Sequence, residues 1–400
     1  MHNSLSEIRV LDLTNVLAGP FCCQQMAHMG ADVIKIEVPK SGDLARQLGA
    51  DYSLNAQKMG ISFLAQNSGK RSISLNLKSA KGKAVLLELV STADVLVENF
   101  RPGVMERLGL GYEVLKKVNS KLVYCAISGF GADGPMVKQP AYDQIIQGLS
   151  GVMSITGAPE NAPYRVGYPI CDTIGGITSA FAISSALVGR EKTGEGCFID
   201  VSLLESTMVT MGWVVSNYLI GGQDPVPMGN DNFTASPSGT FKTGNGLINL
   251  AANKQEQFEA VCHVIGRPDL IENPKFNLRE KRLLNRDELT AFIEEGFSNN
   301  SAEYWEIKLN SLGVPAGRVL TVPEALELEQ IKYRDLEIEF KDVPLIERNI
   351  KVVKTGFKIN KNRPSVSFRP PLLGEHTFEI LNELGYLDED INKMLEDGCI

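Results

Sequence analysis

Short apolar runs alternate with helical patterns along the first 130 residues. Apolar runs at 8–13, 32–37, 94–98 and 122–127, together with a period-two stretch at 71–77, predict strands. Helices are expected at 21–29 and from Ser79, a suitable N-cap residue, to Thr92. Strands that alternate with helices at this spacing predict an α/β fold with a mostly parallel, Rossmann-like sheet.

The pattern changes in the second half of the chain. Helical patterns at 174–189 and 202–220 are followed by a linker rich in Gly and Pro at 221–227. Apolar residues on both sides of Gly244-Asn245-Gly246 predict a β-hairpin, and helical patterns continue to about 325. A charged, alternating segment then leads to a Pro-rich turn and a final helix. A smaller α+β domain is therefore expected to begin near residue 223.

Length and composition limit the class of protein. The chain has 400 residues, which is more than a single hydrophobic core usually organises, so two domains are expected. Hydrophobic residues make up 43% of the chain and the formal net charge is −8. An acidic chain lacks the basic face that binds phosphate backbones, so no nucleic-acid partner is expected. We find no signal-peptide pattern and no apolar run long enough to span a membrane, so no membrane association is expected.

The cysteines and histidines do not indicate disulfides or metal sites. The seven cysteines are odd in number and show no C-x-x-C spacing, which favours reduced thiols and a cytoplasmic location. None of the four histidines lies four residues from another, so no metal is expected. The chain also has no G-x-S-x-G sequence of α/β-hydrolases and no Walker sequence.

A glycine-rich segment, Gly129 to Gly134, matches the G-x-G-x-x-G pattern and follows a predicted strand. A dinucleotide-binding segment should open directly into a helix, with an acidic residue about twenty positions further on. Here Pro135 follows the last glycine, and no strand ending in an acidic residue appears near 150. The glycines are better explained by a loop that passes close to another part of the chain.

The stretch from Pro163 to Gly176 carries a lone carboxylate, Asp172, just ahead of an apolar helical pattern. A carboxylate there faces the N–H groups of a helix N-terminus, and the nearby glycines leave room for another molecule. It can be only the helix N-cap, or a functional group beside a bound molecule. Asp143 offers a second carboxylate for a division of acid and base roles, but the spacing does not require the two to meet.

A second polar group follows the strand at 94–98, at the edge of the sheet where ligands usually bind. Asn99, Arg101 and Arg107 are suited to binding phosphate, although solvated surface arginines are the simpler interpretation. Lys70-Arg71 and Lys78 flank another strand and can complete an anion-binding rim.

Taken together, these segments resemble the class III CoA-transferase family (CaiB/BaiF, formyl-CoA transferase-like) over nearly the whole chain. Each segment is weak evidence alone, but their order and spacing are specific. The resemblance rests on Val10 to Thr14, Ala18-Gly19-Pro20, Ala31 to Glu37, Gly69 to Ile73, Val97 to Gly103, Ser128 to Gly131, Gly167 to Asp172 and Pro371 to His376.

The resemblance implies that Asp172 is the covalent nucleophile and that CoA or an acyl-CoA is bound as substrate, with no permanently bound cofactor. It implies an interlocked homodimer whose large Rossmann-like domain is built from 1–222 and a return segment 326–400, with a small α+β domain at 223–325. The implied CoA-binding residues are Leu17, Ala18, Val38, Leu75, Asn76, Leu77, Lys78, Asn99, Phe100, Arg101, Arg107, Pro140, Ala141, Tyr142 and Asp143.

The resemblance also implies the chemistry: transfer of CoA from a small acyl-CoA to a free carboxylic acid through an aspartyl-CoA intermediate. The loop 229–239 is expected to exclude water as a lid, and N–H groups at 174–176 to stabilise oxyanions. A formyl-CoA transferase would carry a run of glycines where this chain has Asn232 to Gly239, and Val38 replaces a basic residue of some relatives. The overall sequence resembles more closely the family members that use succinyl-CoA and dicarboxylates.

Two alternatives share the fold. An α-methylacyl-CoA racemase needs a second proton-transfer group, a histidine in the first half of the chain. The histidines before Asp172 are His2 and His28, and position 142 is Tyr142, which is a poor base near neutral pH. The other alternative is a CoA-binding protein without catalytic activity, and the presence of Asp172 counts against it.

Overall fold

The computed structural model describes residues 4–400, so His2 lies outside the described residues. The chain divides into two compact units. Unit 1 contains the residues up to 152, 165–223 and 332–400, and unit 2 contains 153–164 and 224–331. Residues 153–164, which the sequence division placed in the large domain, belong to unit 2 because Gly229 N donates to Gly157 O at 2.8 Å.

Among the described residues, the main sheet of unit 1 has six strands in the order β3-β2-β1-β4-β5-β6, and every pairing is parallel. This arrangement confirms the predicted α/β fold with a parallel sheet. Strand β6 was not predicted, because Asp200 interrupts the apolar run that marks the other strands. The strands are β1 (Arg9–Asp12), β2 (Asp32–Glu37), β3 (Lys70–Ser74), β4 (Val95–Glu98), β5 (Val123–Ser128) and β6 (Cys197–Ser202).

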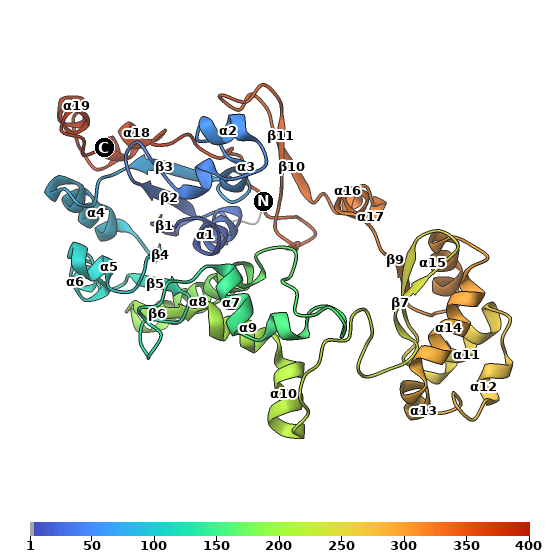
Figure 1. Ribbon diagram of the computed structural model, residues 1–400. Helices are drawn as coiled ribbons and strands as arrows, with labels where there is room; N and C mark the ends of the chain where they lie inside the picture. Colours follow the sequence, from blue (N-terminus) through green and yellow to red (C-terminus); the bar gives the residue numbers. More distant parts are fainter. Residues whose placement is uncertain (1–3) are drawn as a thin grey trace. The chain divides into compact units, whose positions relative to one another are not determined.

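Helices cover both faces of this sheet (Figure 1). Neighbouring residues of β1 show why: Val10 packs with α1 and α8, and Leu11 packs with α4 and the C-terminal helices. Parallel strands buried on both faces give the near-continuous apolar runs seen in the sequence. The helices of unit 1 include α1 (Ala18–His28), α2 (Tyr52–Ala56), α3 (Ile61–Leu64), α4 (Ala80–Thr92), α5 (Val104–Leu108), α6 (Tyr112–Val118), α7 (Asp143–Leu149), α8 (Ile170–Thr193), α9 (Leu203–Thr210), α10 (Gly212–Gly221), α18 (Thr377–Glu383) and α19 (Asp388–Glu396).

Helix α8 is long and apolar enough to cross a membrane by length and composition alone. In the structure one side of it packs against α1, α9 and strands β5 and β6, and 33% of its most apolar stretch is buried. Two of its glycines allow this close packing. A Cβ at Gly175 would lie 2.2 Å from Leu203 Cδ2, and one at Gly176 would lie 2.6 Å from Ala18 O.

Unit 2 confirms the predicted hairpin. Strands β7 (Ser238–Lys242) and β8 (Leu247–Ala251) pair antiparallel across the Gly244-Asn245-Gly246 turn, and β9 (Ala316–Arg318) adds to β8. An apolar core centred on Phe258, Phe297 and Trp305 lies within this unit. Its helices are α11 (Gln255–Val264), α12 (Asp269–Glu272), α13 (Arg279–Leu284), α14 (Arg286–Phe297), α15 (Ala302–Ser311) and α16 (Val322–Leu326).

Three predicted elements differ from the structure. The helix expected at 202–220 is interrupted at Met211, where α9 ends and α10 begins. The single final helix is two helices, because Gly385 with φ 90° ends the first of them. Within the charged segment, β10 (Glu337–Phe340) and β11 (Ile350–Val353) pair antiparallel, and α17 (Glu329–Tyr333) precedes them.

Candidate active site

Asp172 lies in the first turn of α8 rather than at its N-cap, which is Pro169. It is therefore not the capping residue that one interpretation of the sequence proposed. The side chain is partly exposed, and no hydrogen bond to its carboxylate is found within residues 4–400. A carboxylate in the first turn of a 24-residue helix lies in the favourable field of the helix dipole, and it is left free to meet another molecule.

Asp143 meets Asp172 through the backbone of α8. Its Oδ1 accepts the N–H of Cys171 at 2.8 Å and the N–H of Asp172 at 3.3 Å. Asp143 itself is 7% exposed, so its carboxylate accepts these N–H groups from the interior of the fold. Asp143 therefore caps the N-terminus of α8, which is the role that one interpretation of the sequence assigned to Asp172.

A glutamine completes this arrangement. Gln147, one turn further along α7 and fully buried, donates its Nε2 to Asp143 Oδ2 at 2.6 Å. Its Oε1 accepts the N–H of Val166 at 2.8 Å. Gln147 thus connects the carboxylate of Asp143 to the segment that leads into α8. Nothing in the sequence pattern had distinguished this glutamine from other helical residues.

The pKa of Asp172 is raised to about 7, first by burial and then by the charge of Asp143. A carboxyl group with such a pKa is about half ionised at neutral pH and is more basic than an ordinary aspartate. Perturbed carboxyl pairs of this kind concentrate at functional sites. The two carboxylates that the spacing left unconnected therefore form one electrostatic unit.

The N–H groups at 174–176 do not form the oxyanion site that the sequence predicted. These residues lie inside α8, where each backbone N–H bonds the carbonyl four residues earlier. The earlier donors of the helix are also taken: Ile170 N bonds Tyr168 O, and Thr173 N bonds Pro169 O. The glycines at 175 and 176 serve helix packing instead.

The loop between β1 and α1 approaches α8 one turn beyond Asp172. Ala18 O lies against Gly176 there, and Leu17 is the N-cap residue of α1. Val16 in this loop has φ 69°, which is rare for a β-branched residue. The N–H of Val16 is held by the buried Asp43 Oδ1 at 2.9 Å.

Buried lysines fix the same loop through its carbonyl groups. Lys35 Nζ donates to Thr14 O at 2.8 Å, and Lys70 Nζ donates to Pro20 O at 2.9 Å. Both lysines are paired with carboxylates: Lys35 with Asp43 at 3.0 Å and Lys70 with Asp12 at 2.7 Å. The loop is thus held in a strained shape by a fully buried ionic network. The sequence predicted that Lys70 could contribute to an anion-binding rim. In the structure its ammonium group is buried and is bound by Asp12 and the carbonyl of Pro20.

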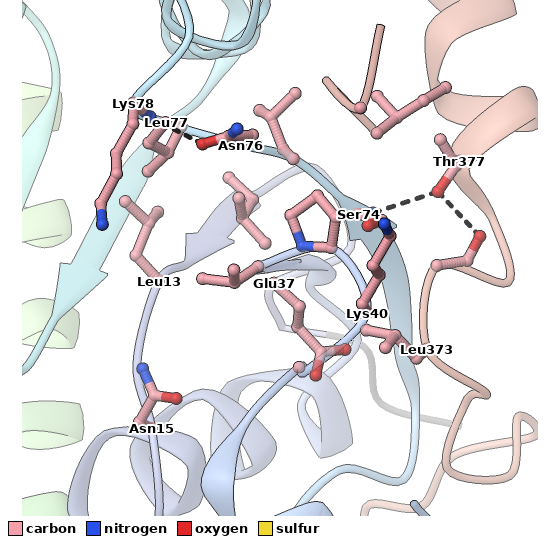
Figure 2. A pocket seen from close by; sticks show the side chains of 18 of the residues that line it. Leu13, Asn15, Glu37, Lys40, Ser74, Asn76, Leu77, Lys78, Leu373 and Thr377 are labelled. Carbon is pink, nitrogen blue, oxygen red and sulfur yellow. Dashed lines mark hydrogen bonds between the residues drawn. The ribbon is translucent and has the colours of Figure 1, made fainter. Parts of the chain in front are cut away.

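A cavity of about 940 Å³ lies at the carboxyl ends of β1 to β4 (Figure 2). This is the edge at which ligands bind in open parallel sheets. Figure 2 shows Asn15, Lys40 and Lys78 around it, with Leu373 and Thr377 of the C-terminal segment on one side. The residues implied for CoA that line it are Val38, Leu75, Asn76, Leu77, Lys78 and Phe100.

The other implied CoA residues lie outside the cavity lining. Asn99 Oδ1 accepts the N–H of Asn15 and its Nδ2 donates to Asn15 O, both at 2.8 Å, so this side chain joins two loops of the site. Arg101 and Arg107 are exposed and form no ion pair in the chain from residue 4 onward, and the guanidinium of Arg107 lies over Gly103. The exposed residues Pro140 and Tyr142 and the half-buried Ala141 precede α7.

Ala141 also accounts for one of the glycines at 129–134. A Cβ at Gly129 would lie 2.4 Å from Ala141 Cβ, so the loop passes close to this segment, as expected. No helix follows Gly134 before α7, which agrees with the argument against a dinucleotide site.

The loop expected to act as a lid is tied down within unit 2. Arg279 donates to Thr234 O at 2.7 Å, and Arg282 donates to Ser236 O at 3.0 Å. Arg286 reaches the carbonyl of Asn232. Three arginines thus hold the backbone of this loop against α13 and α14.

His28, the described histidine that precedes Asp172, is not suited to act as its partner base. His28 is buried against Ser68, and burial lowers its pKa to about 4. A proton-transfer group opposite Asp172, which a racemase requires, is therefore not supplied by His28. Within residues 4–400 no group of three or more His, Cys, Asp or Glu is placed to hold a metal ion, and all seven cysteines are free.

The profile of CoA-transferase family III matches residues 5–377. The chain belongs to this family. It is 35% identical over 397 residues to succinyl-CoA:glutarate CoA-transferase of Mus musculus, covering 99% of this chain and 90% of that protein. It is 39% identical over 356 residues to acetyl-CoA:oxalate CoA-transferase of Acetobacter aceti, covering 89% and 90%.

A solved structure shares the fold. A CaiB/BaiF family protein from Brucella suis superposes with a TM-score of 0.85 at 33% identity, covering 96% of this chain and all of that one. The protein is thus a family III CoA-transferase, and the transferase interpretation is favoured over the racemase.

Proposed function

We propose that this enzyme moves CoA from a small acyl-CoA, of the succinyl-CoA class, to a free dicarboxylic acid through an aspartyl-CoA intermediate on Asp172. The observation that carries the proposal is the placement of Asp172. Its partly exposed carboxylate has no partner in the described chain, its backbone is fixed by Asp143, and its pKa is raised to about 7. A basic, uncommitted carboxylate is a suitable nucleophile toward a thioester.

The reaction takes place in two halves that mirror each other. A carboxylate oxygen of Asp172 attacks the thioester carbonyl, the C–S bond breaks, and CoA leaves as the thiolate. The thiolate then attacks the aspartyl carbonyl of the mixed anhydride and expels the donor acid as its carboxylate, which leaves CoA on Asp172. The acceptor carboxylate reverses both steps and regenerates free Asp172. One thioester replaces another, so no nucleotide hydrolysis and no permanently bound cofactor are required.

Oxygen labelling tests this route. With an acceptor acid carrying ¹⁸O in both carboxylate positions, attack on the aspartyl thioester and collapse of the anhydride leave one acceptor oxygen on Asp172. We expect mass spectrometry of the peptide with Asp172 to show this label after turnover with succinyl-CoA and ¹⁸O-glutarate. Donor omission and Asp172→Asn are the controls, and both should give an unlabelled peptide. Efficient transfer by the wild type without label on Asp172 would contradict the aspartyl intermediate.

The names of the relatives guide the choice of substrates. The mouse relative is named for succinyl-CoA and glutarate, and the bacterial one for acetyl-CoA and oxalate. Both acceptors are dicarboxylates, and this is the class we assign to the chain. The test is a panel of carboxylic acids with succinyl-CoA, in which every new acyl-CoA is measured by LC–MS. A monocarboxylic acid as the dominant acceptor would overturn the assignment.

The proposal includes the interlocked homodimer and a cytoplasmic location. Helix α10 has no buried residue, and Trp213, Leu219 and Ile220 on it are 76%, 73% and 87% exposed. An apolar helix of this kind supports a contact with a second copy of the chain. We expect light scattering to give a dimer that resists dilution, and Trp213→Glu to weaken it.

The seven free thiols support a reducing compartment, as expected for a cytoplasmic location.

A further inference from the structure

Val16, in the loop between β1 and α1, has a backbone conformation that its own side chain disfavours. Its φ is 69°, in the left-handed region, where the Cβ is crowded by the backbone and where glycine or asparagine is usual. Eight non-glycine residues of the described chain have a positive φ, and Val16 is the β-branched one among them. Such strain persists only where the surrounding structure imposes it, and it concentrates at functional sites.

Asp43 imposes this conformation on Val16. Its Oδ1 accepts the N–H of Val16 at 2.9 Å and the N–H of Ala45 at 2.9 Å, and its Oδ2 lies 3.0 Å from Lys35 Nζ. Asp43 is in turn fixed by its own N–H, which donates to Glu37 Oε2 at 2.9 Å. The side chain of Asp43 is 1% exposed, so solvent does not compete for these bonds. Both carboxylate oxygens are therefore committed to partners that hold the loop.

The two residues before Val16 are held in the same way. The N–H of Thr14 donates to Asp12 Oδ1 at 2.9 Å. Asn15 exchanges two hydrogen bonds of 2.8 Å with the side chain of Asn99. Each backbone N–H from Thr14 to Val16 thus meets a side-chain oxygen, and the turn is determined by its surroundings rather than by the preference of the valine.

The position of this turn connects it with the reaction. Asn15, on one side of Val16, lines the cavity of about 940 Å³ (Figure 2). On the other side the chain enters α1, where Ala18 O lies against Gly176, one turn beyond Asp172 in α8. The loop therefore runs from the cavity to the helix that carries the reactive carboxylate, and its shape sets how the two are joined.

We propose that Asp43 is a positioning residue for the transfer reaction, which holds Val16 in a strained turn and thereby places the start of α1 beside Asp172. A valine released from this hold returns to the extended region that β-branched residues prefer. A glycine adopts a positive φ at little cost, so it keeps the turn without the help of Asp43. The inference rests on the proposed role of Asp172 as the nucleophile.

Asp43→Asn tests the hold with a side chain of nearly the same shape. The amide has one accepting oxygen, and the ammonium group of Lys35 attracts it, so the NH2 turns toward the N–H of Val16 and that hydrogen bond is lost. We expect kcat with succinyl-CoA and glutarate to fall about tenfold, because small displacements near reacting groups are costly in rate. KM for succinyl-CoA should change less, since Asp43 does not line the cavity.

Val16→Gly supplies the rescue that a merely structural role of Asp43 does not predict. In the Val16→Gly protein, Asp43→Asn should lower kcat only about twofold, because the glycine turn needs no hold. Leu345→Gly is the matched control. Leu345 has φ 68°, is 56% exposed and lies in the connection from β10 to β11. Combined with Leu345→Gly, Asp43→Asn should keep the whole loss, which separates relief of the turn from a general gain in Tm.

Three outcomes of these kinetics would overturn the proposal. They are a wild-type kcat in Asp43→Asn, an equal loss in all three backgrounds, and a recovery by Leu345→Gly as large as that by Val16→Gly. Hydrogen exchange adds a readout that needs no change at position 43. The amides of residues 14–16 all donate to side chains, so peptides covering 13–16 should exchange slowly in the wild type. Rapid exchange there would also refute the hold.

The failure of this inference can be told apart from the failure of the proposed function. Transfer by the wild type without ¹⁸O label on Asp172 would refute the nucleophile. The dependence of the Asp43→Asn loss on the residue at position 16 would still decide whether Asp43 positions the loop.

Discussion

Replacing Asp143 by asparagine separates the charge of the second carboxylate from its role as a cap. In Asp143→Asn the amide oxygen can still accept the N–H groups of Cys171 and Asp172. The charge that raises the pKa of Asp172 is removed. The new NH2 faces Gln147 Nε2, which donates to Asp143 at 2.6 Å in the wild type, so one buried hydrogen bond is lost. This loss costs about 1–3 kcal/mol of stability.

The expected effect is on the pH dependence of transfer. With a pKa of about 7, Asp172 in the wild type is about one-tenth ionised at pH 6. Because the ionised form is the nucleophile, kcat/KM should fall about tenfold per pH unit below 7. Removing the charge of Asp143 lowers the pKa of Asp172, so the acidic limb of Asp143→Asn should move to lower pH. The plateau should fall modestly, since a less basic carboxylate is a weaker nucleophile.

The assay is kcat/KM for succinyl-CoA with a fixed dicarboxylate between pH 5 and pH 9. Asp133→Asn changes the net charge equally at an exposed position and should leave the profile unchanged. Asp143→Ala removes both charge and cap, so it should lose activity at every pH as well as shifting the limb. An acidic limb that stays near pH 7 in Asp143→Asn, or moves to higher pH, would refute the electrostatic coupling of the two carboxylates.

Three further variants test the packing and the charges of the site. Asp172→Asn should stabilise the fold at pH 8, because the pKa of the folded state is raised from 3.8 to about 7 and ionisation therefore costs stability, at most about 4 kcal/mol. The gain in Tm should be complete above pH 7 and vanish below about pH 4, and a gain independent of pH would count against the raised pKa. Gly176→Ala should lose about 1–3 kcal/mol in urea unfolding through overpacking, since its Cβ would meet a carbonyl at 2.6 Å. Gly189→Ala, in the same helix with open space around it, should instead gain about 0.5–1 kcal/mol, and equal effects would disprove the close approach of α1. Lys70→Met leaves the buried carboxylate of Asp12 without its closest cation, and a loss of about 3–5 kcal/mol is expected in the same experiment. A loss under about 1 kcal/mol would show that the remaining lysine of the network compensates.

Much of the fold was predictable because its signals are local. The runs that became β1, β2, β4 and β5 are buried on both faces, so their apolar character is continuous along the chain. Ser79 caps α4 through a bond between its Oγ and Gly82 N, three residues further on. Strand β6 was missed because Asp200, which is exposed, interrupts its apolar run.

The candidate site was less predictable because its contacts join distant segments. Asp143 and Asp172 are far apart in sequence, and no spacing rule brings a residue of one helix to the N-terminus of another. The same holds for Asn99 with Asn15, whose contact depends on the order of strands in the sheet. The resemblance to the family pointed to Asp172, but only the fold shows that burial and Asp143 raise its pKa.

The raised pKa of Asp172 also has a consequence for the direction of the proposed chemistry. In the mixed anhydride the CoA thiolate can attack either carbonyl. Attack on the aspartyl carbonyl expels the substrate carboxylate, whereas attack on the acyl carbonyl expels Asp172. A free carboxylic acid has a pKa near 4, so its anion is a weaker base than Asp172 and departs more readily. Under the proposed mechanism, burial and Asp143 thus favour aspartyl-CoA and release of the first acid in the first half-reaction. The same bias opposes the last step, in which Asp172 must leave the acceptor anhydride.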